Sequence, residues 1–178
     1  RRDEAKAREL VKASGYDGRE LQLFVAKGSD RLRAAELLMA DWARVGIKSK
    51  VLVYELGELY KRSAAGEHDI VLLSWFGDNG DPDNFLAPNL SCAADQSGGN
   101  KAHWCDKEFD GWLDAAARST NKAERIALYK RAQKRVHDQA AVIPLTYNKL
   151  FTVLHKRVRG YVPSPFATND FRAVSLDK

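Results

Sequence analysis

Between residues 21 and 75 the chain alternates between two hydrophobic periods. Apolar residues two apart, as in Leu21, Leu23 and Val25, are typical of a β-strand, whereas a spacing of three and four is typical of a helix. The pattern predicts a strand at 21–25, a helix N-capped by Ser29 and closed by Gly46, a strand at 47–54, a helix at 55–65 and a strand at 69–75. Two helical crossovers between three strands favour parallel pairing, so we expect an α/β fold.

Helices and further strands are expected on both sides of this segment. A polar helix at 3–14 ends at Gly15, a residue type that commonly follows a helix C-terminus. Downstream, the sequence predicts helices at 106–119 and 121–139, the second with Ile126, Tyr129, Ala132 and Val136 on one side. Two strands are predicted at 142–147 and 151–154, around Asn148 and Lys149. After Gly160 the periodicity is lost, as in a connecting segment.

The composition places the chain among ordinary globular domains. Its 178 residues are 44% hydrophobic and 30% charged, and no apolar run approaches the ~20 residues that span a bilayer. The net charge of +5 is spread along helices among acidic residues, which argues against a nucleic-acid partner. Residues 1–7 contain no apolar segment of the signal-peptide type, so the protein is either cytosolic or lacks its beginning here.

The segment after Trp75 is the first place to expect a ligand, because ligands of parallel sheets bind beyond the carboxyl ends of strands. It holds three aspartates, but a calcium loop would also need a bidentate Glu at its far end, which is absent. Asp81 precedes Pro82, a combination typical of an N-cap and first helical residue. Asp78 follows aromatic residues at the strand end, and could hold a cationic group such as an ammonium or simply cap the loop.

Cys92, His103 and Cys105 raise two alternatives. Together with Asp106 they could bind zinc, although structural zinc sites usually contain a C-x-x-C pair. A disulfide around the polar, glycine-rich segment fits better and would indicate an oxidising compartment. Nucleophile-elbow and phosphate-loop motifs are absent from the sequence, so we expect no catalytic residues and no cofactor.

The segment Trp75-Phe76-Gly77-Asp78-Asn79-Gly80-Asp81-Pro82-Asp83-Asn84-Phe85 closely resembles the ligand loop of dipeptide-binding proteins of bacterial ATP-binding cassette importers. Haem- and glutathione-binding relatives share much of it. The resemblance continues in the segments 40–46, 66–68, 129–133, 137–140 and 159–162. It implies one lobe of a type II periplasmic-binding-protein fold, with a mixed, mostly parallel sheet flanked by helices. Residues 1–160 would form the carboxy-terminal ligand-binding lobe, and residues 161–178 the hinge or return segment toward an amino-terminal lobe.

The resemblance also implies roles for individual residues. Asp78 would bind the α-amino group of a peptide, Trp75 and Phe76 would line the pocket, and Gly77 and Asn79 would belong to the binding loop. Cys92 and Cys105 match a disulfide pair of the family. The family's carboxylate-binding arginine has no aligned counterpart in the shortened segment 26–31, where Lys27 or Arg31 could substitute.

The function implied is that of a periplasmic substrate-binding component. It would capture a dipeptide or small peptide between two lobes and present it to an inner-membrane permease, without chemistry. A different ligand, such as glutathione, haem, a longer peptide or an antimicrobial peptide, is the main alternative. A zinc-dependent hydrolase that uses His103 and the aspartate loop, or a basic nucleic-acid module, would be another class of protein.

Overall fold

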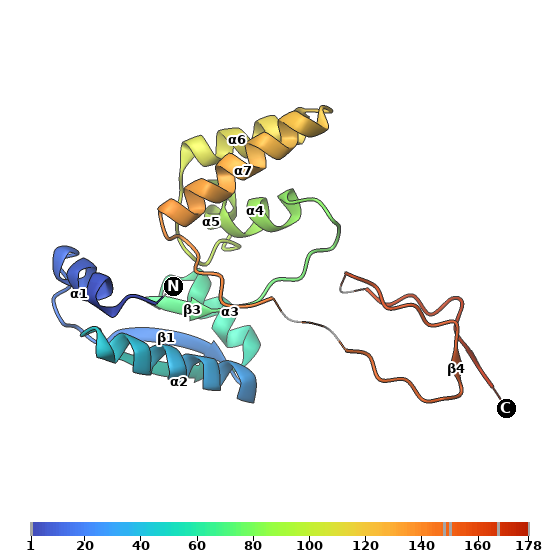
Figure 1. Cartoon of the computed structure of the whole chain (residues 1–178), viewed down its shortest axis with the longest axis horizontal. Coiled ribbons are helices and arrows are strands. Elements are labelled where there is room, and N and C mark those ends of the chain that lie inside the picture. The colour runs from blue at the N-terminus through green and yellow to red at the C-terminus, as the bar shows by residue number, and fades with distance from the viewer. Residues whose placement is uncertain (1, 148, 150, 167, 178) are drawn as a thin grey trace. The chain divides into compact units, whose positions relative to one another are not determined.

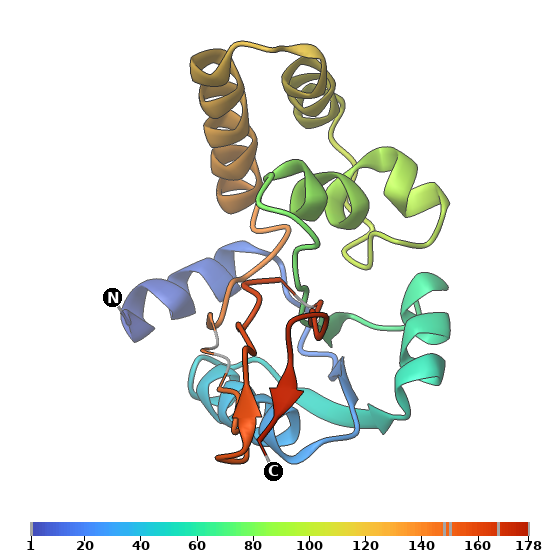
Figure 2. The ribbon, with the colours of Figure 1, turned by 90° about the vertical axis from the view of Figure 1, so that its right-hand side faces the viewer.

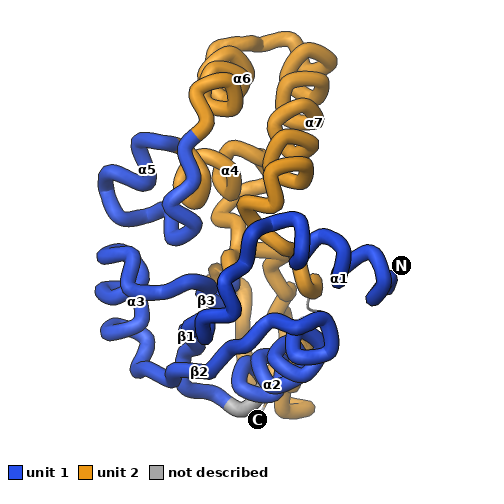
Figure 3. The backbone as a smooth tube through the Cα atoms, turned by 90° about the vertical axis from the view of Figure 1, so that its left-hand side faces the viewer, with its two compact units in different colours: residues 1–74, 92–105 blue, residues 75–91, 106–178 orange. Residues whose placement is uncertain are grey.

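The computed structural model describes residues 2–147, 149, 151–166 and 168–177 (Figure 1). The chain divides into two compact units, which Figure 3 distinguishes by colour. Unit 1 consists of Arg1–Ser74 and Cys92–Cys105, and unit 2 consists of Trp75–Ser91 and Asp106–Lys178. Each unit is described by itself below.

Unit 1 is built on a three-stranded parallel sheet. Its strands β1 (Leu21–Ala26), β2 (Ser49–Tyr54) and β3 (Ile70–Leu72) are ordered β2-β1-β3. Leu23 of the central strand pairs with Val51 on one side and Ile70 on the other. The prediction of an α/β unit with parallel pairing is confirmed, although β3 is shorter than the predicted segment 69–75.

Helices α2 (Ser29–Arg44) and α3 (Leu56–Ala64) cover opposite faces of this sheet. Leu23 and Val25 pack with Ala35 of α2, whereas Phe24 and Ala26 pack with Leu59 of α3. This division follows from the strand itself, because successive side chains point to opposite faces. A strand covered on both faces must be apolar throughout, and residues 23–26 are all buried.

The helix boundaries agree with the predicted ones to within a few residues. Helix α1 (Glu4–Ala13) is capped by Asp3, whose carboxylate accepts from the backbone N–H of Lys6 at 2.8 Å. The prediction of Ser29 as the N-cap of α2 is wrong, because Ser29 is already helical and Gly28 occupies the cap position with a φ of 155°. Only a glycine adopts that backbone angle without strain.

The second part of unit 1 is a disulfide-closed segment. A short helix, α5 (Cys92–Gln96), begins it, and a disulfide between Cys92 and Cys105 closes it, which confirms the predicted bond. Asn100, at its centre, is fully buried and donates to the carbonyl of Trp104 at 2.7 Å. His103 contacts the carboxylate of Asp95 at 2.7 Å.

Unit 2 contains a helical layer. Helices α6 (Lys107–Arg118) and α7 (Lys122–Asp138) form a hairpin, and α4 (Asp83–Leu90) packs against α6. Asp106 caps α6 and Asn121 caps α7, as side-chain acceptors for backbone N–H groups. The buried side chains of this layer are Leu86, Leu90, Phe109, Leu113, Ala116, Tyr129, Ala132 and Val136. Ile126, predicted on the same face, is 45% exposed.

The prediction of strands at 142–147 and 151–154 is wrong for the described residues. These residues have no strand pairing, and Tyr147, Phe151 and Val153 are each more than 85% exposed. A β-strand needs a neighbouring strand for its backbone hydrogen bonds, which an alternating sequence alone does not supply. The predicted turn at Asn148 lies outside the described residues.

Further along unit 2, a short antiparallel pair forms where no strand was predicted (Figure 2). Strand β4 (Val158–Arg159) pairs with β5 (Ser175–Leu176). Gly160 follows β4 with a φ of 72°, and a Cβ at this position would overlap the carbonyl oxygen of Ala173. Among the helices of the described chain, we find none with the length and apolar character needed to cross a membrane.

Candidate functional site

The segment of residues 75–84, here called the ligand loop, leads into α4 at the start of unit 2. It begins at Trp75, three residues after Leu72, which is the last residue of β3. Trp75 and Phe76 are 43% and 51% exposed. Large aromatic side chains that stand in solvent at the end of a strand are available to cover an apolar ligand surface.

Asp78 is held by a reciprocal contact with Asn84. The backbone N–H of Asp78 donates to Oδ1 of Asn84 at 2.8 Å, and Nδ2 of Asn84 donates to Oδ2 of Asp78 at 3.3 Å. The backbone is tight here, since a Cβ on Gly77 would lie 3.1 Å from the carbonyl oxygen of Asn79. The exposed Asp78 carboxylate is therefore oriented, yet it retains acceptor positions for a cationic partner.

Asp81, three residues further on, has a structural role. Its carboxylate accepts from the backbone N–H of Asp83 at 3.0 Å and pairs with the guanidinium of Arg125. The hydrogen bond from Asp83, with Tyr129 and Arg125 nearby, lowers the pKa of Asp81 below its usual value. The prediction of Asp81 as the N-cap and Pro82 as the first helical residue is wrong by one position, because Pro82 occupies the cap position and α4 begins at Asp83. The Asp81 carboxylate nevertheless bonds to the first turn of the helix.

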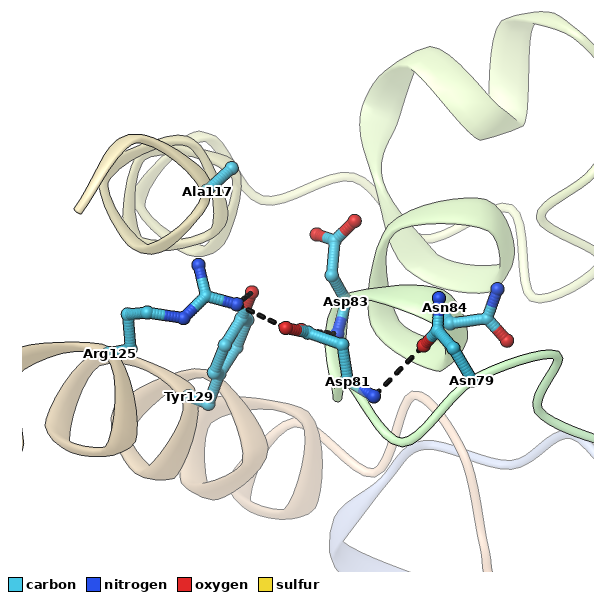
Figure 4. Close-up of a pocket in the computed structure, with 7 residues that line it drawn as sticks. All are labelled: Asn79, Asp81, Asp83, Asn84, Ala117, Arg125 and Tyr129. Atoms are coloured by element: carbon cyan, nitrogen blue, oxygen red, sulfur yellow. Dashed lines mark hydrogen bonds and ion pairs between the residues drawn. The ribbon is translucent and has the colours of Figure 1, made fainter. Parts of the chain in front are cut away.

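A polar cavity of about 290 Å³ lies beside the second half of the ligand loop (Figure 4). It is lined by Asn79, Asp81, Asp83, Asn84, Ala117, Arg125 and Tyr129. Of the loop residues predicted to bind the ligand, Asn79 alone is among the described residues that line this cavity. Trp75, Phe76, Gly77 and Asp78 instead belong to the exposed first half of the loop, outside this cavity.

The two candidates for a carboxylate contact differ in their partners within unit 1. The ammonium of Lys27 lies 2.9 Å from Glu55, and this hydrogen-bonded pair raises the pKa of Lys27. The guanidinium of Arg31 donates to the hydroxyl of Ser74 at 3.0 Å, directly before Trp75 in the chain. Arg31 thus has a neutral partner and further donors, whereas the charge of Lys27 is already paired.

The zinc alternative loses two of its ligands, because Cys92 and Cys105 are joined to each other. His103 has both ring nitrogens engaged, one with Asp95 and one with the carbonyl of Ser63 at 2.9 Å. Within the described parts of the chain, no group of three or more His, Cys, Asp or Glu residues is placed to hold a metal ion.

Three residues around the ligand loop were not predicted: Asn84, Arg125 and Tyr129. Asn84 stands in the motif itself, and its position after Pro82 in the first turn of a helix was a usable signal. Tyr129 was expected only as part of the apolar face of α7. Arg125 is one of many basic residues in that helix, and nothing in its sequence context indicated a contact with the ligand loop.

An α/β unit followed by a loop with exposed aromatics and an oriented carboxylate has the features expected of a ligand-binding module. The model of the family described as "Bacterial extracellular solute-binding proteins, family 5 Middle" matches residues 1–97, which is more than half of the chain. The chain belongs to this family of solute-binding proteins.

Individual relatives agree with this assignment. The chain is 48% identical to Di/tripeptide-binding protein 4 of Pseudomonas aeruginosa over 98% of its length. It superimposes with a TM-score of 0.90 on a dipeptide-binding protein from Pseudoalteromonas sp. SM9913 in complex with Met-Leu, at 30% identity over 98% of the chain and 36% of that structure. A periplasmic binding protein from Helicobacter pylori in complex with the peptide STSA gives a TM-score of 0.86, at 32% identity over 99% of the chain and 35% of that structure. The chain spans about a third of the length of these relatives, 34% for the Pseudomonas aeruginosa protein.

Proposed function

We propose that this chain is the carboxy-terminal ligand-binding part of the substrate-binding component of a peptide importer. It captures a dipeptide or small peptide and does no chemistry on it. The observation that carries the proposal is the oriented, exposed carboxylate of Asp78 beside exposed Trp75 and Phe76. Similarity to a relative named as a di/tripeptide-binding protein supports the same ligand class.

Asp78 receives the α-ammonium of the peptide in this proposal. A carboxylate and an ammonium form a charge-assisted hydrogen bond, which is about twice as strong as a neutral one. The apolar surfaces of Trp75 and Phe76 contact the first side chain, and backbone groups around Gly77 and Asn79 pair with the peptide main chain. Arg31 is the better candidate for the peptide carboxylate, because its planar guanidinium can donate to two oxygens at once and its partner in unit 1, the hydroxyl of Ser74, is neutral.

The remaining parts of the proposal extend the family assignment to the complete protein. Residues 1–160 belong to the ligand-binding lobe, and residues 161–178 return toward an amino-terminal lobe that supplies the rest of the pocket. Ligand binding favours closure of the two lobes, and the closed form is presented to an inner-membrane permease. The disulfide between Cys92 and Cys105 supports a location in an oxidising compartment such as the periplasm.

Calorimetry with the complete two-lobed protein tests this proposal. Met-Leu is titrated into the unsubstituted protein, into Asp78→Ala and into Asp114→Ala, a matched control that removes an exposed carboxylate on α6. We expect Asp78→Ala to lose about 2–5 kcal/mol of binding free energy, since truncation of one partner of a buried charge pair has this cost. Asp114→Ala should bind as the unsubstituted protein does.

Ligand chemistry provides a second arm of the same experiment. N-acetyl-Met-Leu lacks the ammonium group, so its affinity should already be low and Asp78→Ala should not lower it further. If Asp78→Ala binds Met-Leu as well as the unsubstituted protein does, Asp78 is not the ammonium contact. If neither Met-Leu nor the tetrapeptide Ser-Thr-Ser-Ala binds, the ligand is not a short peptide.

A further inference from the structure

Arg125, in the first turn of α7, connects three parts of unit 2 (Figure 4). Its guanidinium pairs with the carboxylate of Asp81, donates to the backbone carbonyl of Ala116 in α6, and lies 3.4 Å from the hydroxyl of Tyr129. The Arg125 side chain is 24% exposed and Tyr129 is 3% exposed. Because the donors of a guanidinium lie in one plane in fixed directions, these partners fix the position of Asp81 relative to both helices.

Asp81 transmits this fixed position to the start of α4. Its carboxylate accepts from the backbone N–H of Asp83 at 3.0 Å, and its carbonyl accepts from the backbone N–H of Asn84 at 3.2 Å. The side chain of Asn84 then holds the backbone and the carboxylate of Asp78. A continuous set of contacts therefore runs from Arg125 through Asp81 and Asn84 to Asp78.

We propose that Arg125 is a positioning residue for peptide binding, which fixes Asp81 and the first turn of α4 so that Asn84 aims the Asp78 carboxylate at the peptide ammonium. This inference rests on the proposed function, because it requires Asp78 to be the ammonium contact. Arg125 acts through Asp81 and Asn84, and contacts no part of the peptide.

The same two helices provide a matched control. Arg135 of α7 pairs with Asp106 at 2.8 Å, and Asp106 accepts from a backbone N–H in the first turn of α6, as Asp81 does in the first turn of α4. Both pairs thus join an α7 arginine to an aspartate that accepts a backbone hydrogen bond at the start of a helix. The Arg135 pair fastens α7 to α6, whereas the Arg125 pair fastens α7 to the ligand loop. A purely structural role would make the two arginines equivalent in a binding experiment.

The test measures Met-Leu affinity by calorimetry in the complete two-lobed protein. The variants are Arg125→Gln, Arg135→Gln, Asp78→Ala and the double variant Arg125→Gln/Asp78→Ala. We expect Arg125→Gln to weaken binding roughly two- to thirtyfold, the range found for mutations within contacting networks. Arg135→Gln should leave the affinity unchanged even where it lowers the melting temperature. In the Asp78→Ala background, Arg125→Gln should cause no further loss.

Two further readouts separate positioning from general stability. The ratio of the affinities for Met-Leu and N-acetyl-Met-Leu should fall in Arg125→Gln and stay constant in Arg135→Gln. Arg125→Lys, which keeps the charge beside Asp81 but lacks the planar fork, should fold and show an intermediate affinity. This variant also keeps the test decisive if Arg125→Gln does not fold.

The outcomes are distinguishable from those of the proposed function. If Asp78→Ala retains full affinity for Met-Leu, the ammonium contact is wrong and the positioning role falls with it. If Asp78→Ala loses affinity while Arg125→Gln matches Arg135→Gln, the proposed function stands and the positioning role is wrong. Additive losses from Arg125→Gln and Asp78→Ala would also contradict positioning, since independent sites add.

Discussion

The disulfide-closed segment of residues 92–105 and the ligand loop of residues 75–84 are fixed by different means. The first is closed by a covalent bond, has a fully buried Asn100 near its centre and engages both ring nitrogens of His103. The second is fixed at one end by Asp81 and Arg125, while Trp75, Phe76 and Asp78 at its other end are exposed.

This difference separates a structural loop from a binding loop. In residues 92–105 the polar groups named above are satisfied internally, so little is left to recognise a ligand. In the ligand loop one aspartate is satisfied by its own protein and another, three residues away, keeps spare acceptor positions. A residue type and its place in a motif therefore do not define its role, which is set by the number of partners that the fold supplies.

The largest expected effect on the free energy of unfolding comes from loss of the disulfide. Replacement of both Cys92 and Cys105 by Ser should lower the free energy of unfolding by about 3 kcal/mol, as expected for a loop with a sequence separation of 13. Urea denaturation of the complete protein measures this loss, and hydrogen exchange locates it in residues 92–105. Met-Leu affinity should be unchanged. A loss of affinity as large as that of Asp78→Ala would instead assign this loop to the binding site.

Removal of the Asp81 carboxylate should have the next largest effect on the free energy of unfolding. Asp81→Ala removes the carboxylate that accepts from the backbone N–H of Asp83, which costs about 1 kcal/mol, and leaves the guanidinium of Arg125 without its acidic partner, at a similar further cost. The second cost lies at the low end of its range because the Asp81 side chain is 40% exposed. Urea denaturation should show a total loss of about 2 kcal/mol. A loss near zero would show that Asp81 does not fix the loop.

Acid should reproduce part of this loss. The pKa of Asp81 is lowered in the folded protein, so its ionised form stabilises the fold above the unfolded value near 3.8. That contribution disappears as the pH falls through the lowered folded pKa. Melting temperatures measured between pH 6 and pH 2 should therefore fall less steeply below pH 4 in Asp81→Asn than in the unsubstituted protein. Parallel profiles would contradict the assigned role of the carboxylate.

The smallest expected effect on stability is that of the exposed aspartate. Asp78→Ala should change the free energy of unfolding by less than about 0.5 kcal/mol, as is usual for exposed positions, despite its large effect on peptide affinity. The same urea denaturation experiment measures it beside Asp81→Ala. An equal loss in the two variants would make Asp78 a loop cap, which is the alternative that the sequence left open.

The parallel sheet of unit 1 could be predicted because its signals are local. The residues of β1 alternate between two covered faces, and Gly15, Gly46 and Gly66 follow the ends of the helices, all with positive φ. The strands predicted at 142–147 and 151–154 were wrong for the converse reason. Their alternation is real, but a strand forms only where another strand accepts its hydrogen bonds.

The candidate site was likewise predictable only where its signals are local in the sequence. Pro82 after Asp81 predicted the start of α4 to within one residue, without knowledge of the fold. Asn84 was missed although its place in the motif was a usable signal, whereas Arg125 escaped prediction because its role depends on distance in space. Arg125 is 44 residues from Asp81 in the chain, and only the packing of the α6–α7 hairpin beside the loop brings the two charges together.

The central claim is that Asp78 binds the ammonium group of a peptide. A crystal structure of the complete two-lobed protein with bound Met-Leu tests it most directly. We predict that the peptide nitrogen lies about 2.7–2.9 Å from an Asp78 carboxylate oxygen, the distance of a charge-assisted hydrogen bond, with Asn84 still bonded to Asp78. A peptide whose ammonium is bound by another group, with the Asp78 carboxylate in solvent, would contradict the claim.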